Sequence, residues 1–259
     1  PAVLVVDLLL SEHTTPDADD SLASSLRKFP NVVIGAAIAS DGAERWVEPL
    51  PEFARSARTA HVHASPEADG VVRSVSVLKV AEGRRYWALG FEAARLAFGA
   101  GVPIEARDYV ELGGIRIPAG ETAERLMTIN YAGPEGTFKR FPLAAVLEGE
   151  VAPETFRGKI VIAGATAQGS GERLFTPFSS GLGMSGIEIH ANVARTILDR
   201  AFLDPLDTLA ELLVYALIAV AAVLLVVKFR GVRLIVALAA LAVALPVAAY
   251  AGSIPIVTT

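Results

Sequence analysis

Short apolar runs alternate with polar or amphipathic segments through the first 200 residues. Residues 2–6, 31–38 and 159–165 are rich in β-branched side chains and bounded by polar segments, which is typical of buried strands. Residues 87–98 and 187–198 have the pattern of helices that pack one face against a core. Strands that alternate with helices predict an α/β fold with a mixed sheet and flanking helices.

Turn signals and weaker patterns predict further elements in the same region. Side chains alternate between two faces over residues 71–80, and the turn pair Glu82-Gly83 follows, so we expect a β-hairpin into residues 84–86. Gly99 is expected to end the helix at 87–98. Further helices are expected near residues 16–29, 49–57 and 142–150, and further strands near 59–63, 115–117 and 126–131.

The last fifth of the chain has a different pattern. Residues 209–227 are apolar except for Glu211, and residues 234–252 contain no charge, with Pro246 inside the run. A bilayer needs about 20 apolar helical residues, and packed neighbours make proline tolerable there. We therefore expect an outer domain over 1–205 and a transmembrane helical hairpin within 206–259; two buried core helices are the alternative.

The segment between the two apolar runs, residues 228–233, reads KFRGVR and carries three basic residues and no acid. Short basic loops stay on the cytoplasmic side of a membrane. This places residues 1–205 and the C-terminal Thr259 on the opposite side.

Charge and composition narrow the classes of partner. The chain has a net charge of −5, and residues 1–205 hold 26 acidic and 20 basic residues, which argues against a nucleic-acid partner. Without cysteine, the chain has neither disulfides nor thiol chemistry. The chain opens directly on a strand pattern with no signal peptide, so we expect an export element upstream.

A glycine-bearing loop follows the strand at 159–165. GATAQG has the glycine spacing of a phosphate-binding loop, but Ser170 and Gly171 replace its Lys and Ser/Thr, and G-x-S-x-G is missing. We therefore interpret the loop as the scaffold of a binding crevice at the carboxyl end of a parallel strand. Its scaffold residues are Gly164, Gly169, Gly171, Pro177 and Gly186.

Polar residues near this loop are candidates for ligand contacts. Each also has a structural explanation, as a turn residue, a charge on a strand face, or a helix cap. The candidates are Asp69, Arg73, Glu172, Thr176, His190 and Asn192.

Two clusters resemble metal sites in part. His61 and His63 share one face of a strand, and Asp69 or Glu67 is a conceivable third ligand; two half-exposed strand histidines are the alternative. The acidic cluster at residues 17–20, formed by Asp17, Asp19 and Asp20, is more typical of a helix N-terminus than of a calcium site.

Several motifs taken together resemble a known family. GKIVIAGATA, FTPF and GMSGIEIHANVARTIL, with VVDLLLSE, NVVIGAAI and ADGVVRSVSVLK upstream, are similar to the CHASE domain of the second type over nearly all of residues 1–203. Two features depart from the family pattern: its upstream anchor and first strand are missing, and Glu172 stands where an aspartate is expected.

The resemblance implies an extracytoplasmic sensory domain of a bacterial signalling receptor in the inner membrane, without catalysis, metal or cofactor in this chain. It implies a cyclase, histidine kinase or Ser/Thr kinase output beyond Thr259, and a homodimer that binds a small ligand or a periplasmic protein. It supplies no ligand-binding residues. The alternatives are a membrane-anchored metal-dependent hydrolase that uses His61, His63 and His190, and a ligand-free dimerisation module.

Overall fold

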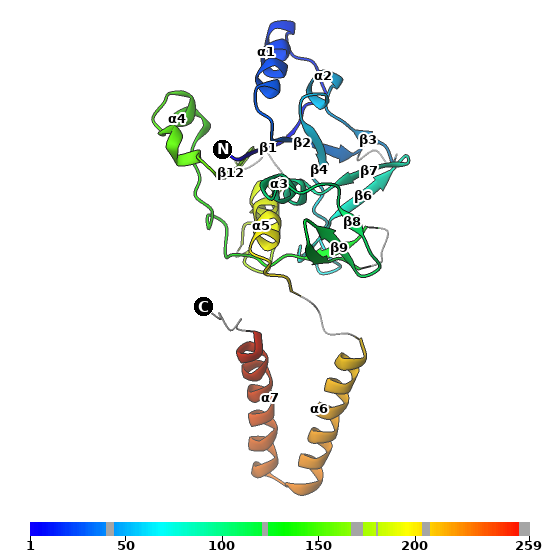
Figure 1. Ribbon diagram of the computed structural model, residues 1–259. Helices are drawn as coiled ribbons and strands as arrows, with labels where there is room; N and C mark the ends of the chain where they lie inside the picture. Colours follow the sequence, from blue (N-terminus) through cyan, green and yellow to red (C-terminus); the bar gives the residue numbers. More distant parts are fainter. Residues whose placement is uncertain (40–43, 121–123, 167–172, 180, 204–207, 254–259) are drawn as a thin grey trace. The chain divides into compact units, whose positions relative to one another are not determined.

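The computed structural model describes the chain except for residues 40–43, 121–123, 167–172, 180, 204–207 and 254–259 (Figure 1). The chain divides into two compact units, Pro1–Asp204 and Pro205–Thr259.

The first unit contains strands and helices in mixed order (Figure 1). Its strands are β1 (Val3–Leu9), β2 (Val32–Ile38), β3 (Trp46–Val47), β4 (Arg58–His61), β5 (Ser74–Ser76), β6 (Leu78–Ala81), β7 (Arg84–Trp87), β8 (Ile104–Glu105), β9 (Tyr109–Leu112), β10 (Ile115–Pro118), β11 (Leu126–Thr128), β12 (Ile160–Gly164), β13 (Arg173–Leu174) and β14 (Met184–Ser185). Its helices are α1 (Pro16–Arg27), α2 (Pro51–Ala54), α3 (Leu89–Ala97), α4 (Leu143–Leu147), the 3-10 helix η1 (Pro153–Phe156) and α5 (Gly186–Leu198).

The main sheet is mixed, as the sequence predicts. β12, β1 and β2 lie side by side in parallel, β4 pairs in parallel with β2, and β3 pairs antiparallel with the end of β2. The three apolar runs that predict buried strands are β1, β2 and β12. Their carboxyl ends therefore meet at one edge of the sheet.

Helices cover both faces of this sheet. Val3 and Val5 of β1 are fully buried against Leu89 of α3 and Ala194 of α5. The alternate residues of β1, Leu4 and Val6, pack with residues of α1 and α2 on the opposite face of the sheet. Because successive strand side chains point to opposite faces, this pattern gives a layer of helices on each side of the sheet.

A second, larger core lies on the side of α3 and α5 away from the sheet. Val75 of β5 and Met127 of β11 are buried there with Phe91 of α3 and Val193 of α5. α3 and α5 thus pack between two cores. Their crossing is tight at Gly90, where a Cβ atom would lie 2.5 Å from the His190 carbonyl oxygen.

The segment at residues 71–80 differs from the predicted single alternating strand. It bends at Val77, so that β5 pairs with β11 while β6 pairs with β7. The bend buries Ser76, Val77 and Leu78 in succession, which breaks the two-face alternation. The predicted hairpin turn is confirmed at Glu82 and Gly83, which both have positive φ, the conformation of a type I′ turn.

Two helices differ from their predicted patterns. Trp87 pairs with Leu78 in the β6–β7 hairpin, so α3 begins at Leu89. Gly99 follows the end of α3 with φ of +60°, as predicted. In α1, the helical spacing of Leu22, Leu26 and Phe29 predicts the apolar face, but the buried residues are Asp19, Ala23 and Leu26, and Leu22 is exposed.

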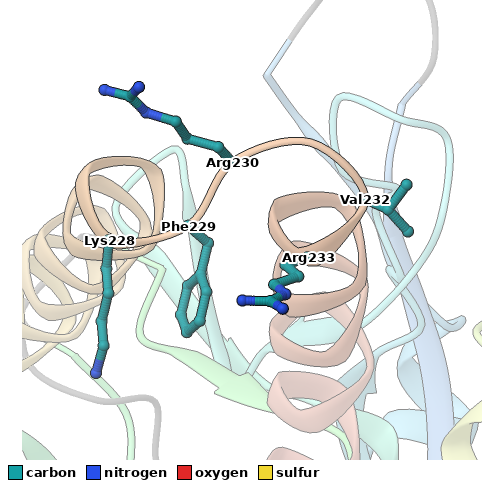
Figure 2. Close-up of a pocket in the computed structure, with 5 residues that line it drawn as sticks. All are labelled: Lys228, Phe229, Arg230, Val232 and Arg233. Carbon is teal, nitrogen blue, oxygen red and sulfur yellow. The ribbon is translucent and has the colours of Figure 1, made fainter.

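The second unit is a pair of helices, α6 (Thr208–Lys228) and α7 (Val232–Ser253), joined through Gly231 at φ of +59°. Lys228, Phe229, Arg230, Val232 and Arg233 line a hollow of about 510 Å³ at the turn between them (Figure 2). Among the described residues, neither helix meets the combined length and apolarity required to cross a bilayer, so the expected transmembrane hairpin is not confirmed.

Candidate functional site

The carboxyl end of β12 meets the start of α5 at a close contact. A Cβ atom on Gly164 would lie 3.0 Å from the Asp7 Cβ atom and 3.4 Å from the Ile187 Cδ1 atom. A side chain at 164 would therefore be crowded by its neighbours, and φ is not positive at this glycine. The contact brings the ends of β1 and β12 to the first turn of α5, where the ligand crevice is expected.

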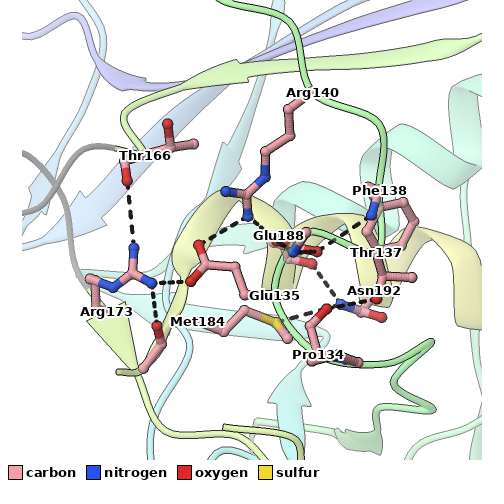
Figure 3. Close-up of polar contacts among 12 residues, drawn as sticks. Pro134, Glu135, Thr137, Phe138, Arg140, Thr166, Arg173, Met184, Glu188 and Asn192 are labelled. Carbon is pink, nitrogen blue, oxygen red and sulfur yellow. Dashed lines mark hydrogen bonds and ion pairs between the residues drawn. The ribbon is translucent and has the colours of Figure 1, made fainter. Parts of the chain in front are cut away.

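A buried carboxylate lies in the first turn of α5. The Glu188 side chain is only 2% exposed, and its oxygens accept hydrogen bonds from the backbone N–H groups of Gly136, at 2.9 Å, and Phe138, at 3.5 Å (Figure 3). Arg140 donates to the same carboxylate. A buried carboxylate is costly unless it is paired and hydrogen-bonded, and here both conditions are met.

The pairing continues as a chain of alternating charges (Figure 3). Arg140 also donates to Glu135 at 3.0 Å, and Glu135 accepts from Arg173, which donates further to the Gly183 carbonyl. We call Glu188, Arg140, Glu135 and Arg173 the charge chain. Its two acids and two bases balance, and it joins α5, residues 135–140 and β13.

Hydrogen bonds and neighbouring charges keep the two central members of the charge chain, Glu135 and Arg140, ionised. Burial raises the pKa of Glu135, but hydrogen bonds from Arg140 and Arg173 outweigh it and lower the pKa below its usual value. Burial lowers the pKa of Arg140, but the bonds to Glu135 and Glu188 outweigh it and raise the pKa. Glu135 and Arg140 thus stay charged at neutral pH.

Three side chains at helical spacing on α5 clamp the segment 130–138. The Asn192 Oδ1 atom accepts from the Ala132 N–H at 2.8 Å, and the Thr196 Oγ1 atom accepts from the Asn130 N–H at 3.1 Å. Glu188 is the third. The predicted ligand candidate Asn192 is therefore buried in this clamp, beside a hollow of about 150 Å³ at residues 130–132.

The clamp and charge chain contain five residues that sequence reasoning missed: Glu135, Arg140, Arg173, Glu188 and Thr196. The spacing of Glu188, Asn192 and Thr196, four residues apart on one helix face, was a signal for the clamp. The sequence gives no comparable signal for Glu135, Arg140 and Arg173, because their partners are distant along the chain.

The predicted candidate His190 lies on another face of α5, in a buried group with His61 and His63. His190 and His61 are at most 1% exposed, and their positive forms would repel each other. The His61 Nδ1 atom accepts from the His63 N–H at 3.2 Å, and the His63 Nε2 atom accepts from the Ile38 N–H at 2.6 Å. The two rings are 6.0 Å apart.

This geometry does not favour the metal-dependent hydrolase. Backbone N–H groups occupy one ring nitrogen of His61 and one of His63. Among the described residues, these histidines do not belong to a group of three possible ligand atoms that all lie within 4.8 Å of one another. The conceivable third ligands, Asp69 and Glu67, bind Arg73 instead.

The buried histidines predict a pH dependence of stability. Burial, followed by the charges of His63, His190 and Lys79, lowers the pKa of His61 well below 6.5 in the folded chain. The unfolded chain therefore takes up the proton first as the pH falls. The free energy of unfolding should be constant above about pH 6.5 and fall below it by up to about 1.4 kcal/mol per pH unit for each such histidine.

Urea unfolding of the 259-residue chain between about pH 7.5 and about pH 5, followed by tryptophan fluorescence, measures this slope. Both tryptophans lie in the first unit, at Trp46 and Trp87, so the signal reports that unit. His61→Gln should flatten the slope. An equal slope in the variant would contradict the assignment to His61.

The candidates Asp69 and Arg73 form a local ion cluster at the surface. Arg73 donates to Asp69 at 2.7 Å and to Glu67 at 2.9 Å, and all three side chains are more than 40% exposed. The hydrogen bonds from Arg73 lower the pKa of Asp69 to about 2. Exposed ion pairs contribute little to stability, so these residues are accessible without being structurally essential.

Thr176 lies beside this cluster through backbone pairing. The Val72 N–H donates to the Phe175 carbonyl at 2.7 Å, which joins the two segments. Thr176 itself is buried, and its N–H donates to the Ser179 Oγ atom at 2.9 Å in a turn that includes Pro177. Asp69, Arg73 and Thr176 therefore come from neighbouring segments, and the Arg73 carbonyl accepts from the Ile129 N–H at 2.8 Å, next to the clamped segment.

Four predicted residues remain, three from the loop scaffold and the ligand candidate Glu172. Gly186 is the first residue of α5, after Ser185 at the N-cap. Glu172, Gly169 and Gly171 lie outside the described residues.

Comparison with known proteins gives one match. The family model described as the CHASE2 domain matches residues 1–227. No curated protein and no solved structure matches the chain.

Proposed function

Because this chain belongs to the CHASE2 domain family, whose members are extracytoplasmic sensory domains of signalling receptors, we propose that Pro1–Asp204 senses a stimulus and passes it on through α5. CHASE2 is a sensory and not a catalytic domain. The stimulus we propose is a small ligand or a periplasmic protein bound by a homodimer.

The position of α5 is the observation that carries this proposal. Ala194 packs in the core at the sheet, while Ile189 and Val193 pack in the second core. Only nine residues, 199–207, separate the end of α5 from the start of α6. A shift between the two cores would therefore displace the helix that leads directly into the second unit.

The charge chain supplies the element that a stimulus could bias. It links α5 to two separate segments, residues 135–140 and β13, and each link is an ion pair. A ligand shifts a conformational equilibrium only through different affinity for the two states. We propose that a charged ligand competes for Glu135 or Arg173, which are partly exposed, and thereby loosens α5; Asp69, Arg73 and Thr176 remain further candidate contacts.

The membrane placement is part of the same proposal. It is supported by residues 209–227 and 234–252, two apolar runs that together contain a single charged residue. It is also supported by the basic residues of the α6–α7 turn, Lys228, Arg230 and Arg233. In this arrangement the turn faces the cytoplasm of a bacterial cell. The output module that we propose on that side is a cyclase, a histidine kinase or a Ser/Thr kinase.

Single-cysteine labelling tests the placement, because the chain has no cysteine of its own. Val80→Cys in the first unit and Val232→Cys at the turn replace residues that are 49% and 75% exposed. A membrane-impermeant maleimide should label Val80→Cys in intact spheroplasts, and Val232→Cys only after permeabilisation. The reverse pattern would contradict an extracytoplasmic sensory domain.

A further inference from the structure

A second polar cluster lies on the α1 and α2 side of the main sheet, away from the charge chain. His13 is in the loop after β1, Asp19 is in the first turn of α1, and Glu52 is in the first turn of α2. Three different segments thus bring an imidazole and two carboxylates together.

The distances in this cluster are those of a metal-ligand set. The His13 Nδ1 atom lies 3.1 Å from Asp19 Oδ2 and 3.4 Å from Glu52 Oε1, and all three ligand atoms lie within 4.8 Å of one another. Zinc bonds of about 2.0–2.2 Å in tetrahedral geometry place neighbouring ligand atoms about 3.3 Å apart. The His13–Asp19 and His13–Glu52 distances of 3.1 and 3.4 Å lie on either side of this value.

Hydrogen bonding accounts for only one of the two contacts that the His13 ring makes in this cluster. The Nδ1 atom of a histidine carries at most one proton, yet two carboxylates approach the Nδ1 atom of His13. The contact with Asp19 qualifies as a hydrogen bond. A dication between the three atoms would bind all of them and neutralise both carboxylates.

A neighbouring residue orients the Asp19 carboxylate. The Thr14 Oγ1 atom donates to Asp19 Oδ1 at 2.7 Å, and the Thr14 N–H donates to Oδ2 at 3.2 Å. These bonds direct Oδ2 toward His13. Hydrogen-bonded partners of this kind fix the orientation of metal ligands and raise metal affinity.

We propose that His13, Asp19 and Glu52 bind one divalent transition metal ion of the Zn²⁺ class. The His13 side chain is 69% exposed and Asp19 only 12%, so the site has a buried wall and an open side where water completes the coordination. This inference does not depend on the proposed relay through α5.

Calorimetric titration of the EDTA-treated, dialysed 259-residue chain with Zn²⁺ tests the site. We expect one ion per chain. His13→Ala, Asp19→Asn and Glu52→Gln should each weaken binding about tenfold or more, and Thr14→Val, which leaves all three ligands in place, about 10–100-fold. Titration with Co²⁺ should give an absorption spectrum that His13→Ala abolishes.

Asp17→Asn and Asp20→Asn are the matched controls, because both remove an exposed acid from the same stretch of α1 without touching the cluster. Both should bind Zn²⁺ as the unmodified chain does. Because His13 is largely exposed, His13→Ala is expected to fold, and circular dichroism checks this. Absence of binding by the unmodified chain, or affinity unchanged by His13→Ala in folded protein, would overturn the proposal.

Discussion

Replacing Gly90 by alanine is expected to destabilise the first unit by about 2–4 kcal/mol. The added Cβ atom would lie 2.5 Å from the His190 carbonyl oxygen and 2.8 Å from the Val193 Cβ atom, so α3 and α5 must separate. Overpacking of a core costs about 1–3 kcal/mol or more, and here the obstacle is backbone that cannot rotate away. The better helix propensity of alanine offsets at most about 1 kcal/mol.

Urea unfolding followed by tryptophan fluorescence measures the loss. Gly101→Ala is the matched control, because a Cβ atom on Gly101 would meet no atom within 4 Å. The control should stay within about 0.5 kcal/mol of the unmodified chain. Equal stability of the two variants would contradict the tight crossing of α3 and α5.

Replacing Arg140 by methionine is expected to destabilise the same unit by about 2–3 kcal/mol, because it leaves the buried Glu188 carboxylate without its counter-charge. The loss should be smaller than for a fully buried pair. Arg140 is 39% exposed, and Glu188 keeps its backbone hydrogen bonds from Gly136 and Phe138. Urea unfolding at about pH 7.5 measures the change.

Arg157→Met is the control for this variant. Arg157 also pairs with a glutamate, Glu154, but both side chains are more than 65% exposed, and such pairs contribute about 0–1 kcal/mol. If Arg140→Met were no more destabilising than Arg157→Met, the charge chain would not hold α5. If it were more destabilising but left receptor output and its response to stimulus unchanged, the chain would be structural and the proposed relay would be wrong.

Local patterns in the sequence are sufficient for the main elements of the first unit. The β-branched runs predict β1, β2 and β12 because such side chains favour strands that pack against a core. β1 and β2 contribute to clusters on both faces of the sheet, whereas β12 is partly buried. The Glu82-Gly83 turn is likewise predicted, because the glycine at its second position tolerates positive φ. The pattern at 71–80 is misleading because β5 and β6 pair with different partners, and a bend between them is set by those distant partners.

For the candidate site residues, too, the local sequence predicts the secondary structure, but the contacts of each side chain depend on tertiary packing. The sequence identifies α5 as the helix that carries polar residues, but the direction of each side chain depends on what packs beside it. Asn192 and His190 face different neighbours, a backbone segment in one case and buried histidines in the other. The charge chain joins Glu188 to Arg140, which lies 48 residues before it, and through Glu135 to Arg173, which lies 15 residues before it. No local spacing predicts such contacts.

By itself, the sequence determines the alternation of strands and helices, the division near residue 205 in composition, and membership of a sensory family, because these depend on local hydrophobic period and motif. Only the tertiary structure decides which charges meet. Ion pairs and metal-ligand sets form between segments that are brought together by burial of the sheet and helix faces, and that burial is a property of the whole unit.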